Sequence, residues 1–145
     1  MHFLLSFVIF IFELFTKNYR EKNTENHNYL DGHVKITTYH NYGAFLNKGD
    51  KKPIVVALIS LALSTVLTII FILTFTKYGR SELKSGLALL LGGAYSNTYD
   101  RIRRGYVVDY LQFPKLPKNM KYVVYNISDF CILIGALLLC LKSTK

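Results

Sequence analysis

Acidic residues, and charged residues in general, are scarce in this sequence, and the scarcity excludes an ordinary soluble domain. Only 19% of its 145 residues are charged, whereas 51% are hydrophobic. Residues 53–76 carry no charge at all, and this run is longer than the ~20 residues that a helix needs to cross a bilayer. Between residues 122 and 141, Asp129 is the only side chain that is charged at neutral pH. These runs indicate a membrane protein with several spans, and the length allows one domain, residues 1–145.

Cysteine is also scarce, and the histidines are not clustered. The two cysteines, Cys131 and Cys140, fall in one hydrophobic run, where helical geometry separates them by roughly 13 Å along the axis, too far for a disulfide. The four histidines show no helical ligand spacing, and no Ser–His–Asp or Cys–His arrangement is visible. We therefore expect no disulfide and no metal site, and no nucleophile of the serine or cysteine protease kind.

The charge that is present is mostly basic, with a net charge of +9. A basic excess can indicate nucleic-acid binding. Here the Lys and Arg residues gather in the short connections between hydrophobic runs, where anionic lipid headgroups are the nearest partners. Since the chain has no soluble basic domain, we expect membrane lipid as its neighbour and no nucleic acid.

Four hydrophobic stretches predict an all-α membrane protein with four transmembrane helices, at residues 3–17, 54–76, 83–99 and 122–141. The first stretch is short for a span, so we expect the Lys17 side chain to extend to the membrane interface. A short basic turn, residues 77–82, joins the second span to the third. An even number of spans places both termini on one side, and the count of basic residues in the loops puts that side outside the cell.

The two longer loops, residues 18–52 and 100–121, contain the remaining structural signals. Asp31-Gly32 predicts a hairpin turn, and the alternating residues 34–39 after it are typical of a half-buried strand. We therefore expect a small antiparallel sheet that lies on the membrane surface.

Only three carboxylates follow Leu83, and they are Asp100, Asp109 and Asp129. A charged Asp within a bilayer costs roughly 2.5–3.5 kcal/mol, so Asp129, which we expect about two turns inside the last span, is a functional candidate. If the preceding loop folds back, Asp109 meets Asp129. Two close carboxylates share a proton, and such a pair activates water with its charged member and protonates a leaving amine with the other. Without the resemblance described below, the residues allow an alternative to catalysis. The aspartates could form a structural network of ion pairs with the nearby Arg101, Arg103 and Arg104.

Two asparagines stand three residues before an aspartate, in the pairs Asn97–Asp100 and Asn126–Asp129. On a helix, side chains three apart share a face, so each amide can donate hydrogen bonds into the site of its carboxylate. Gly93 and Ser96 extend the first pair into a stripe of small residues, which allow another helix to approach closely. A packing seam with polar residues at its end is the alternative interpretation.

Four short elements occur in order along the chain: Asn41-Tyr42-Gly43-Ala44, the run from Gly92 to Arg101, Gly105-Tyr106-Val107-Val108-Asp109-Tyr110, and Asn126-Ile127-Ser128-Asp129. Together they resemble the motifs of lipoprotein signal peptidase, also called signal peptidase II, a family of bacterial membrane aspartyl peptidases. An acid and a lysine one helical turn apart, Glu13 and Lys17, match the family's first element. The resemblance covers nearly the whole chain.

The resemblance implies a catalytic pair at Asp109 and Asp129. It implies site support or substrate contact from nine further residues, namely Glu13, Lys17, Asn41, Gly43, Gly93, Asn97, Asp100, Arg101 and Asn126. The family removes the signal peptide from prolipoproteins that already bear diacylglycerol on a cysteine, cutting before that cysteine without metal or cofactor. It places both termini in the cytoplasm and the sheet and active site outside the bacterial cell membrane, contrary to the charge count. We expect the chain to act as a monomer.

The sequence departs from the family pattern at four positions. Glu13 stands where Asp is usual, Ser96 where Gly is usual, Tyr110 where Phe is usual and Ser128 where Ala is usual. We expect the added hydroxyl of Ser128 to reach a catalytic carboxylate. The departures at Glu13, Ser96 and Ser128 leave open a non-catalytic relative that binds lipidated proteins or signal helices in the membrane. A small transporter or channel component is a separate alternative.

Overall fold

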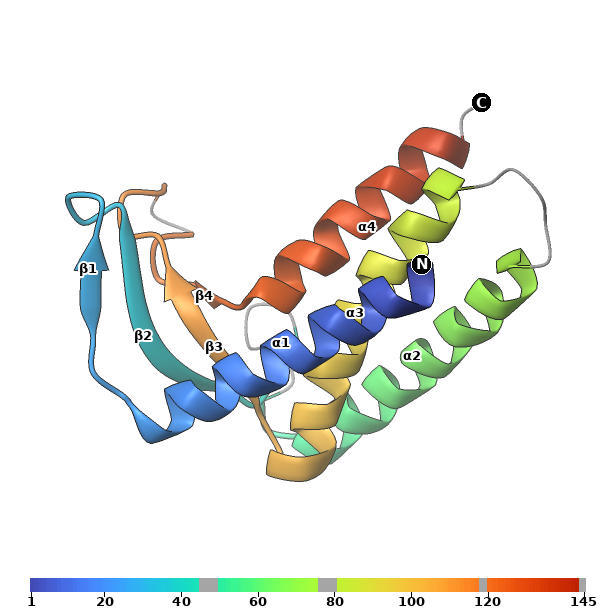
Figure 1. Ribbon diagram of the computed structural model, residues 1–145. Coiled ribbons are helices and arrows are strands. Elements are labelled where there is room, and N and C mark those ends of the chain that lie inside the picture. Colours follow the sequence, from blue (N-terminus) through green and yellow to red (C-terminus); the bar gives the residue numbers. More distant parts are fainter. Residues whose placement is uncertain (45–49, 76–80, 118–119, 144–145) are drawn as a thin grey trace.

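The computed structural model describes residues 1–44, 50–75, 81–117 and 120–143. Within these ranges the chain forms four helices, α1 (His2–Lys22), α2 (Pro53–Phe75), α3 (Ser81–Arg104) and α4 (Ile127–Ser143). Four strands, β1 (His27–Tyr29), β2 (Val34–Asn41), β3 (Val107–Gln112) and β4 (Val124–Tyr125), form one antiparallel sheet in the order β1-β2-β3-β4. The fold is therefore mostly helical with a small sheet at one end, and the N-terminus and the last turn of α4 lie away from that sheet (Figure 1).

Helix α3 is the centre of the bundle, because it packs against α1, α2 and α4. Glycines make the contact with α4 close. A Cβ at Gly93 would clash with the backbone oxygen of Ser128, and one at Gly135 would lie 2.6 Å from the backbone oxygen of Gly86. The predicted close approach along the small-residue stripe of α3 is thus confirmed for Gly93, and any side chain there would force the two helices apart.

Two of the helices are long and apolar enough to cross a membrane, α1 over His2–Lys22 and α2 over Pro53–Thr74. Helix α2 also exposes large apolar side chains, among them Ile54 and Leu73, as a lipid-facing helix does. The apolar part of α4, Ile127–Leu141, is shorter, and α3 ends in polar and basic turns. Length and composition therefore support two spans in the described part of the chain, rather than the four expected.

The helices begin and end elsewhere than the sequence predicts. Helix α1 continues five residues beyond 17, and α3 continues to Arg104, so that Asp100 and Arg101 are helical instead of lying in a loop. Asp129 lies in the first turn of α4, so the prediction of two turns inside the span is wrong. Of the turn expected at residues 77–82, Ser81 and Glu82 belong instead to the first turn of α3, and residues 77–80 lie outside the described residues.

The start of α4 has a local cause, which is a reciprocal cap. The backbone N–H of Asp129 donates to Oδ1 of Asn126 at 3.0 Å, and the backbone N–H of Asn126 donates to Oδ2 of Asp129, also at 3.0 Å. This is a capping box, in which an N-cap side chain and the side chain three residues later satisfy each other's backbone donors. The residues just before it, Val124 and Tyr125, pair with β3 and are therefore not helical.

The sheet joins the two long loops and fixes the position of β3. The predicted hairpin is confirmed: β1 and β2 are joined by a turn in which Leu30, Asp31 and Gly32 have positive φ angles. Strand β2 then pairs with β3, with Tyr39 opposite Asp109. The sheet is anchored on the last turns of α1, since Arg20 donates to Thr38 at 2.9 Å. Asp109 is thereby held next to the end of the helix bundle.

Candidate active site

Strand β3 and helix α4 each contribute one aspartate to a common site, in which Asp109 is buried and Asp129 is half-buried. Asp109, on β3, is 2% exposed, and Asp129 lies in the first turn of α4. Asn126 lies between the two acids. Its side-chain Nδ2 donates to Oδ1 of Asp109 at 2.7 Å, and its backbone N–H donates to Oδ2 of Asp129 at 3.0 Å. One residue thus bridges the two carboxylates.

Two further amides complete the hydrogen bonding of this pair. Nδ2 of Asn97 donates to Oδ1 of Asp129 at 3.0 Å, and Nδ2 of Asn41 donates to Oδ2 of Asp109 at 3.0 Å. Oδ1 of Asn97 also accepts a hydrogen bond from Nδ2 of Asn126 at 3.3 Å. Each of the four carboxylate oxygens therefore accepts one N–H donor, which fixes the orientation of both acids.

The position of Asp109 changes its acidity. Burial, and after it the negative charge of Asp129, raise the pKa of Asp109 from an ordinary 3.8 to about 7. The hydrogen bonds from Asn41 and Asn126 act in the opposite direction, because they favour the charged carboxylate. At neutral pH this carboxyl group is therefore present in both its protonated and its charged form.

Lys17 is buried beside Asn97, and the expectation that it extends to the membrane interface is wrong. Its side chain is 1% exposed, and Nζ donates to Oδ1 of Asn97 at 2.8 Å and to Oγ of Ser96 at 2.9 Å. Carboxylate oxygens of Asp100 and Glu13 lie 3.3 Å and 3.6 Å from the same nitrogen. A buried cation is tolerated where acids and hydrogen-bond acceptors surround it, and here they do.

Asp100 joins the end of α3 to β3 and does not bond to either acid of the pair. Its Oδ2 accepts the backbone N–H of Val108 at 3.2 Å, and its Oδ1 lies 3.4 Å from Nε of Arg104. Asn97 and Asp100 share a helix face, as the spacing predicts, and both contact Lys17. Asp100 thus anchors the residue that precedes Asp109.

Arg101 and Gly43 hold the loop that carries Asn41. Nη2 of Arg101 donates to the backbone oxygen of Gly43 at 3.0 Å, and the backbone N–H of Gly43 donates to Oδ1 of Asn41 at 3.1 Å. With its oxygen used in this way, the Asn41 amide presents its nitrogen to Asp109. The expected residues of this loop therefore act on the pair through Asn41.

Ser128 and Tyr110 both bond to Glu13. The hydroxyl of Ser128 donates to Oε2 of Glu13 at 2.8 Å, so the expectation that it reaches one of the paired carboxylates is wrong. The hydroxyl of Tyr110 donates to Oε1 of the same residue. Tyr110 is not among the site residues expected from the sequence. It stands next to Asp109 and departs from the family pattern, and these two features could have indicated its role.

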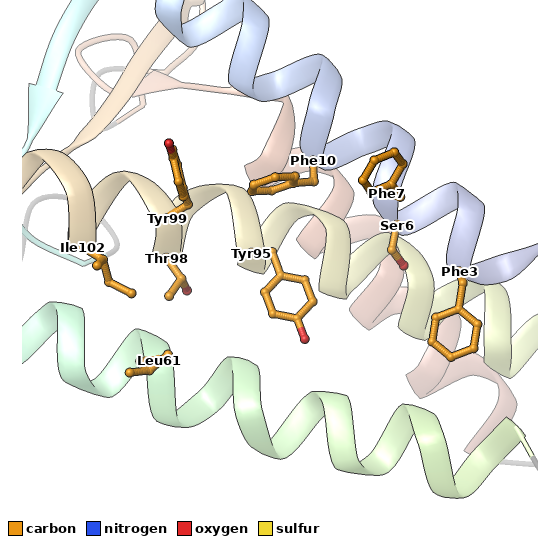
Figure 2. Close-up of a pocket in the computed structure, with 9 residues that line it drawn as sticks. All are labelled: Phe3, Ser6, Phe7, Phe10, Leu61, Tyr95, Thr98, Tyr99 and Ile102. Atoms are coloured by element: carbon orange, nitrogen blue, oxygen red, sulfur yellow. The ribbon is translucent and has the colours of Figure 1, made fainter.

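A separate apolar hollow of about 480 Å³ lies between α1, α2 and α3 (Figure 2). Aromatic rings line most of it, and Figure 2 shows Phe3, Phe7 and Phe10 on α1, Tyr95 and Tyr99 on α3, and Leu61 on α2 at the opposite side. Its lining residues are Phe3, Ser6, Phe7, Phe10, Leu61, Tyr95, Thr98, Tyr99 and Ile102. None of these side chains is charged, and none belongs to the set around the paired acids. Among the described residues, no three His, Cys, Asp or Glu side chains form a group that could hold a metal ion.

Comparison with protein families identifies the class of this protein. A family model described as signal peptidase (SPase) II matches residues 5–145. The chain therefore belongs to the signal peptidase II family, whose members are membrane proteases.

Individual relatives agree with this assignment. The chain is 30% identical to the lipoprotein signal peptidase of Lactobacillus johnsonii over 141 residues, which cover 95% of this chain and 88% of that protein. It is 34% identical to the lipoprotein signal peptidase of Shewanella sediminis over 142 residues, 94% of this chain and 78% of the relative. Two solved bacterial membrane enzyme structures share its fold, with TM-scores of 0.83 and 0.80 and sequence identities of 22% and 21%. Each match covers 99% of this chain, and the matches cover 89% and 92% of the solved chains.

Proposed function

We propose that this protein is an aspartic endopeptidase that removes the signal peptide from diacylglyceryl-modified prolipoproteins, cutting before the lipidated cysteine. The proposed catalytic pair is Asp109 and Asp129. The observation that carries the proposal is the bridging of both carboxylates by Asn126, with one N–H donor on each of their four oxygens. The substrate class is supported by the relatives, which are named lipoprotein signal peptidases.

The chemistry follows from one proton shared between two acids. Asp109, with its pKa raised to about 7, holds this proton at neutral pH and donates it toward the oxygen of the scissile carbonyl. Charged Asp129 accepts a proton from a water molecule, whose oxygen attacks the carbonyl carbon. The C–N bond then breaks as the amine nitrogen takes up the proton from Asp129, while a hydroxyl group of the tetrahedral intermediate returns a proton to Asp109. The amine and the carboxyl product leave, and the pair again holds one proton.

Asn97, Asn126 and Asn41 hold the acids in place during these steps. Because each amide donates to a carboxylate oxygen, the acids cannot rotate away from a bound peptide without losing a hydrogen bond. Lys17 orients the Asn97 side chain, because its Nζ donates a 2.8 Å hydrogen bond to Oδ1 of Asn97. The residues predicted as site support thus act by positioning the pair.

We propose further that the chain crosses the bacterial cell membrane four times as a single domain, residues 1–145, and acts as a monomer without metal or cofactor. Both termini lie in the cytoplasm, and the sheet lies outside. This arrangement is supported by Figure 1, in which the sheet lies at the end of the bundle away from the N-terminus and the last turn of α4. The paired acids, on β3 and at the start of α4, then lie near the lipid–water boundary, where an acylated peptide can reach them from the bilayer.

Binding without cleavage is the second candidate function. The apolar hollow between α1 and α2 favours it, because about 480 Å³ of space lined by uncharged side chains suits an acyl chain or an apolar helix. A protein of this kind would bind lipidated proteins or signal helices through that hollow and would not use the acids as a catalytic pair.

A cleavage assay separates the two candidates. Purified protein in lipid nanodiscs is mixed with a diacylglyceryl-modified prolipoprotein and with the same precursor lacking the lipid, and the products are identified by mass spectrometry. We expect one cut, before the lipidated cysteine, and none in the unmodified precursor. Binding of the lipidated precursor with no cleavage after long incubation would favour the second candidate.

A further inference from the structure

Glu13 links β3 and α4 at a point next to both paired acids. It is 0% exposed, and three donors surround its carboxylate. The hydroxyl of Tyr110 donates to Oε1, while Oε2 accepts the hydroxyl of Ser128 at 2.8 Å and its backbone N–H at 3.2 Å. One side chain of α1 therefore bonds to two other elements of the fold at once.

The bonded residues are direct neighbours of the acids in the chain. Tyr110 follows Asp109 on β3, and Ser128 precedes Asp129 in α4. The hydroxyl oxygen of Tyr110 also accepts a hydrogen bond from the backbone N–H of Ile127 at 3.4 Å, which adds a direct contact between β3 and α4. A movement of either element away from Glu13 would move one aspartate relative to the other.

Charge and acidity favour this arrangement. The Glu13 carboxylate lies at the N-terminus of α4, where free backbone N–H groups and the helix dipole favour an anion. Lys17, one turn along α1, supplies a cation 3.6 Å from Oε2. Burial, and after it the charge of Glu13, raise the pKa of Tyr110, so its hydroxyl keeps its proton and remains a donor. The hydrogen bond from Tyr110 to Glu13 therefore keeps its donor at neutral and mildly alkaline pH.

Glu13, Tyr110 and Ser128 are three of the four positions at which the sequence departs from the family pattern. The fourth, Ser96, accepts a hydrogen bond from Lys17, which also contacts Glu13. A longer acid at position 13 thus coincides with two added hydroxyls that bond to it. A shorter acid would leave at least one of these hydroxyls without its acceptor.

We propose that Glu13 is a positioning residue that sets the geometry of the Asp109–Asp129 pair through Tyr110 and Ser128, and that these three side chains work as one interdependent set. The proposal rests on the proposed function, since it concerns the rate of the same cleavage. It predicts an effect on turnover, because Glu13 forms its hydrogen bonds with the chain neighbours of both acids and with neither acid itself.

The first test is the kinetics of Glu13→Gln, which has nearly the same shape but no charge. We expect kcat to fall about tenfold or more with KM within about twofold of wild type, since substrate binding is untouched. Glu21→Gln is the matched control: Glu21 is also on α1 and bonds to His40 and Tyr106, but not to a neighbour of either acid. Unchanged kcat in Glu13→Gln, or an equal loss in Glu21→Gln, would overturn the proposal.

The second test measures interdependence. Glu13→Asp is made in wild type and in the double variant Tyr110→Phe/Ser128→Ala. We expect the shorter acid to lower kcat about tenfold in wild type and less than about threefold in the double variant, where both hydroxyls are already absent. An equal loss in both backgrounds would overturn the proposal.

The remaining outcomes are also decisive. If Glu13→Gln does not fold, Tyr110→Phe and Ser128→Ala each remove one bond and keep the carboxylate, and each should lower kcat with KM unchanged; normal turnover in both would overturn the proposal. Failure of the proposed function looks different, because wild type would then not cleave, or Asp109→Asn would cleave normally. Cleavage by wild type that is lost in Asp109→Asn, with full turnover in Glu13→Gln, rejects the role of Glu13 alone.

Discussion

Asn126 contacts Asp109 through its side chain, 2.7 Å from Nδ2 to Oδ1, while the same residue caps the helix that carries Asp129. The residue that starts α4 is therefore also the residue that bridges the proposed catalytic pair. A change in this one side chain affects the stability of the helix and the orientation of the acids, and the two effects can be separated by the choice of substitution.

Asn126→Ala removes both roles, and Asn126→Ser keeps the cap but is too short to bridge. Loss of an N-cap costs about 1 kcal/mol, so we expect Asn126→Ala to lower the Tm by a few degrees and Asn126→Ser to restore most of that loss. We expect both variants to lose at least about tenfold in kcat, because neither donates to Asp109. Thermal unfolding and initial rates measured on the same samples check this. A fully active Asn126→Ser would show that bridging is unimportant.

Asn41→Ala should move the alkaline limb of the pH–rate profile. The Asn41 hydrogen bond favours the charged form of Asp109, so its removal raises the pKa of Asp109 further above 7. Activity that depends on protonated Asp109 then persists to higher pH, although its maximum falls because the carboxylate is less well held. The profile of kcat against pH is the measurement, with Asn23→Ala, on the exposed end of α1, as the control. A limb that stays in place or moves to lower pH contradicts the assignment of Asp109.

Asp109→Asn should stabilise the protein at alkaline pH. The folded state raises the pKa of Asp109 to about 7 from 3.8, so the protonated form is favoured on folding. Its contribution to stability is complete below about pH 4 and is lost as the pH rises through about 7. We therefore expect the Asn variant to exceed wild type in Tm at pH 8 and the difference to shrink towards pH 4. Asp31→Asn, in the exposed hairpin turn, should show no such trend; a difference independent of pH would contradict the pKa.

Lys17→Met should be strongly destabilising. It leaves the carboxylates of Glu13 and Asp100 buried without the cation that lies 3.6 Å and 3.3 Å from them, and removing one partner of a buried ion pair costs about 3–5 kcal/mol. We expect a low yield of folded protein and a large fall in Tm. The double variant Lys17→Met/Asp100→Asn should regain part of the loss, because it removes one of the two acids that lose Lys17 as a partner. A single variant as stable as wild type would show that these acids do not need Lys17.

The sequence predicts the parts of this structure that rest on local patterns. Asp31-Gly32 and the alternating residues after it predict the hairpin and β2, because turn chemistry and side-chain alternation are properties of neighbouring residues. The glycine at position 93 predicts that another helix approaches closely, because glycine has no Cβ, and the structure shows that this helix is α4. The family, and with it the class of enzyme, follows from several motifs in the right order.

The predictions from the sequence that are wrong concern features that depend on contacts between residues distant in the chain. Lys17 is buried because Ser96, Asn97 and Asp100 of α3 surround it, and no local pattern in α1 reports those neighbours. The start of α4 is displaced because β4 pairs with β3, and Ser128 bonds to Glu13 because α1 contacts α4. Hydrophobicity alone counts residues 122–126 as part of the span, since it does not detect the cap at Asn126.

The assignment of the paired acids as catalytic is tested most directly by the cleavage of a diacylglyceryl-modified prolipoprotein by purified Asp109→Asn and Asp129→Asn, with wild type and the exposed Asp31→Asn in parallel. We predict that wild type and Asp31→Asn cleave at similar rates, and that both active-site variants remain folded and bind the precursor but cleave it at least about a thousandfold more slowly. Turnover close to wild type in either Asp109→Asn or Asp129→Asn would contradict the account.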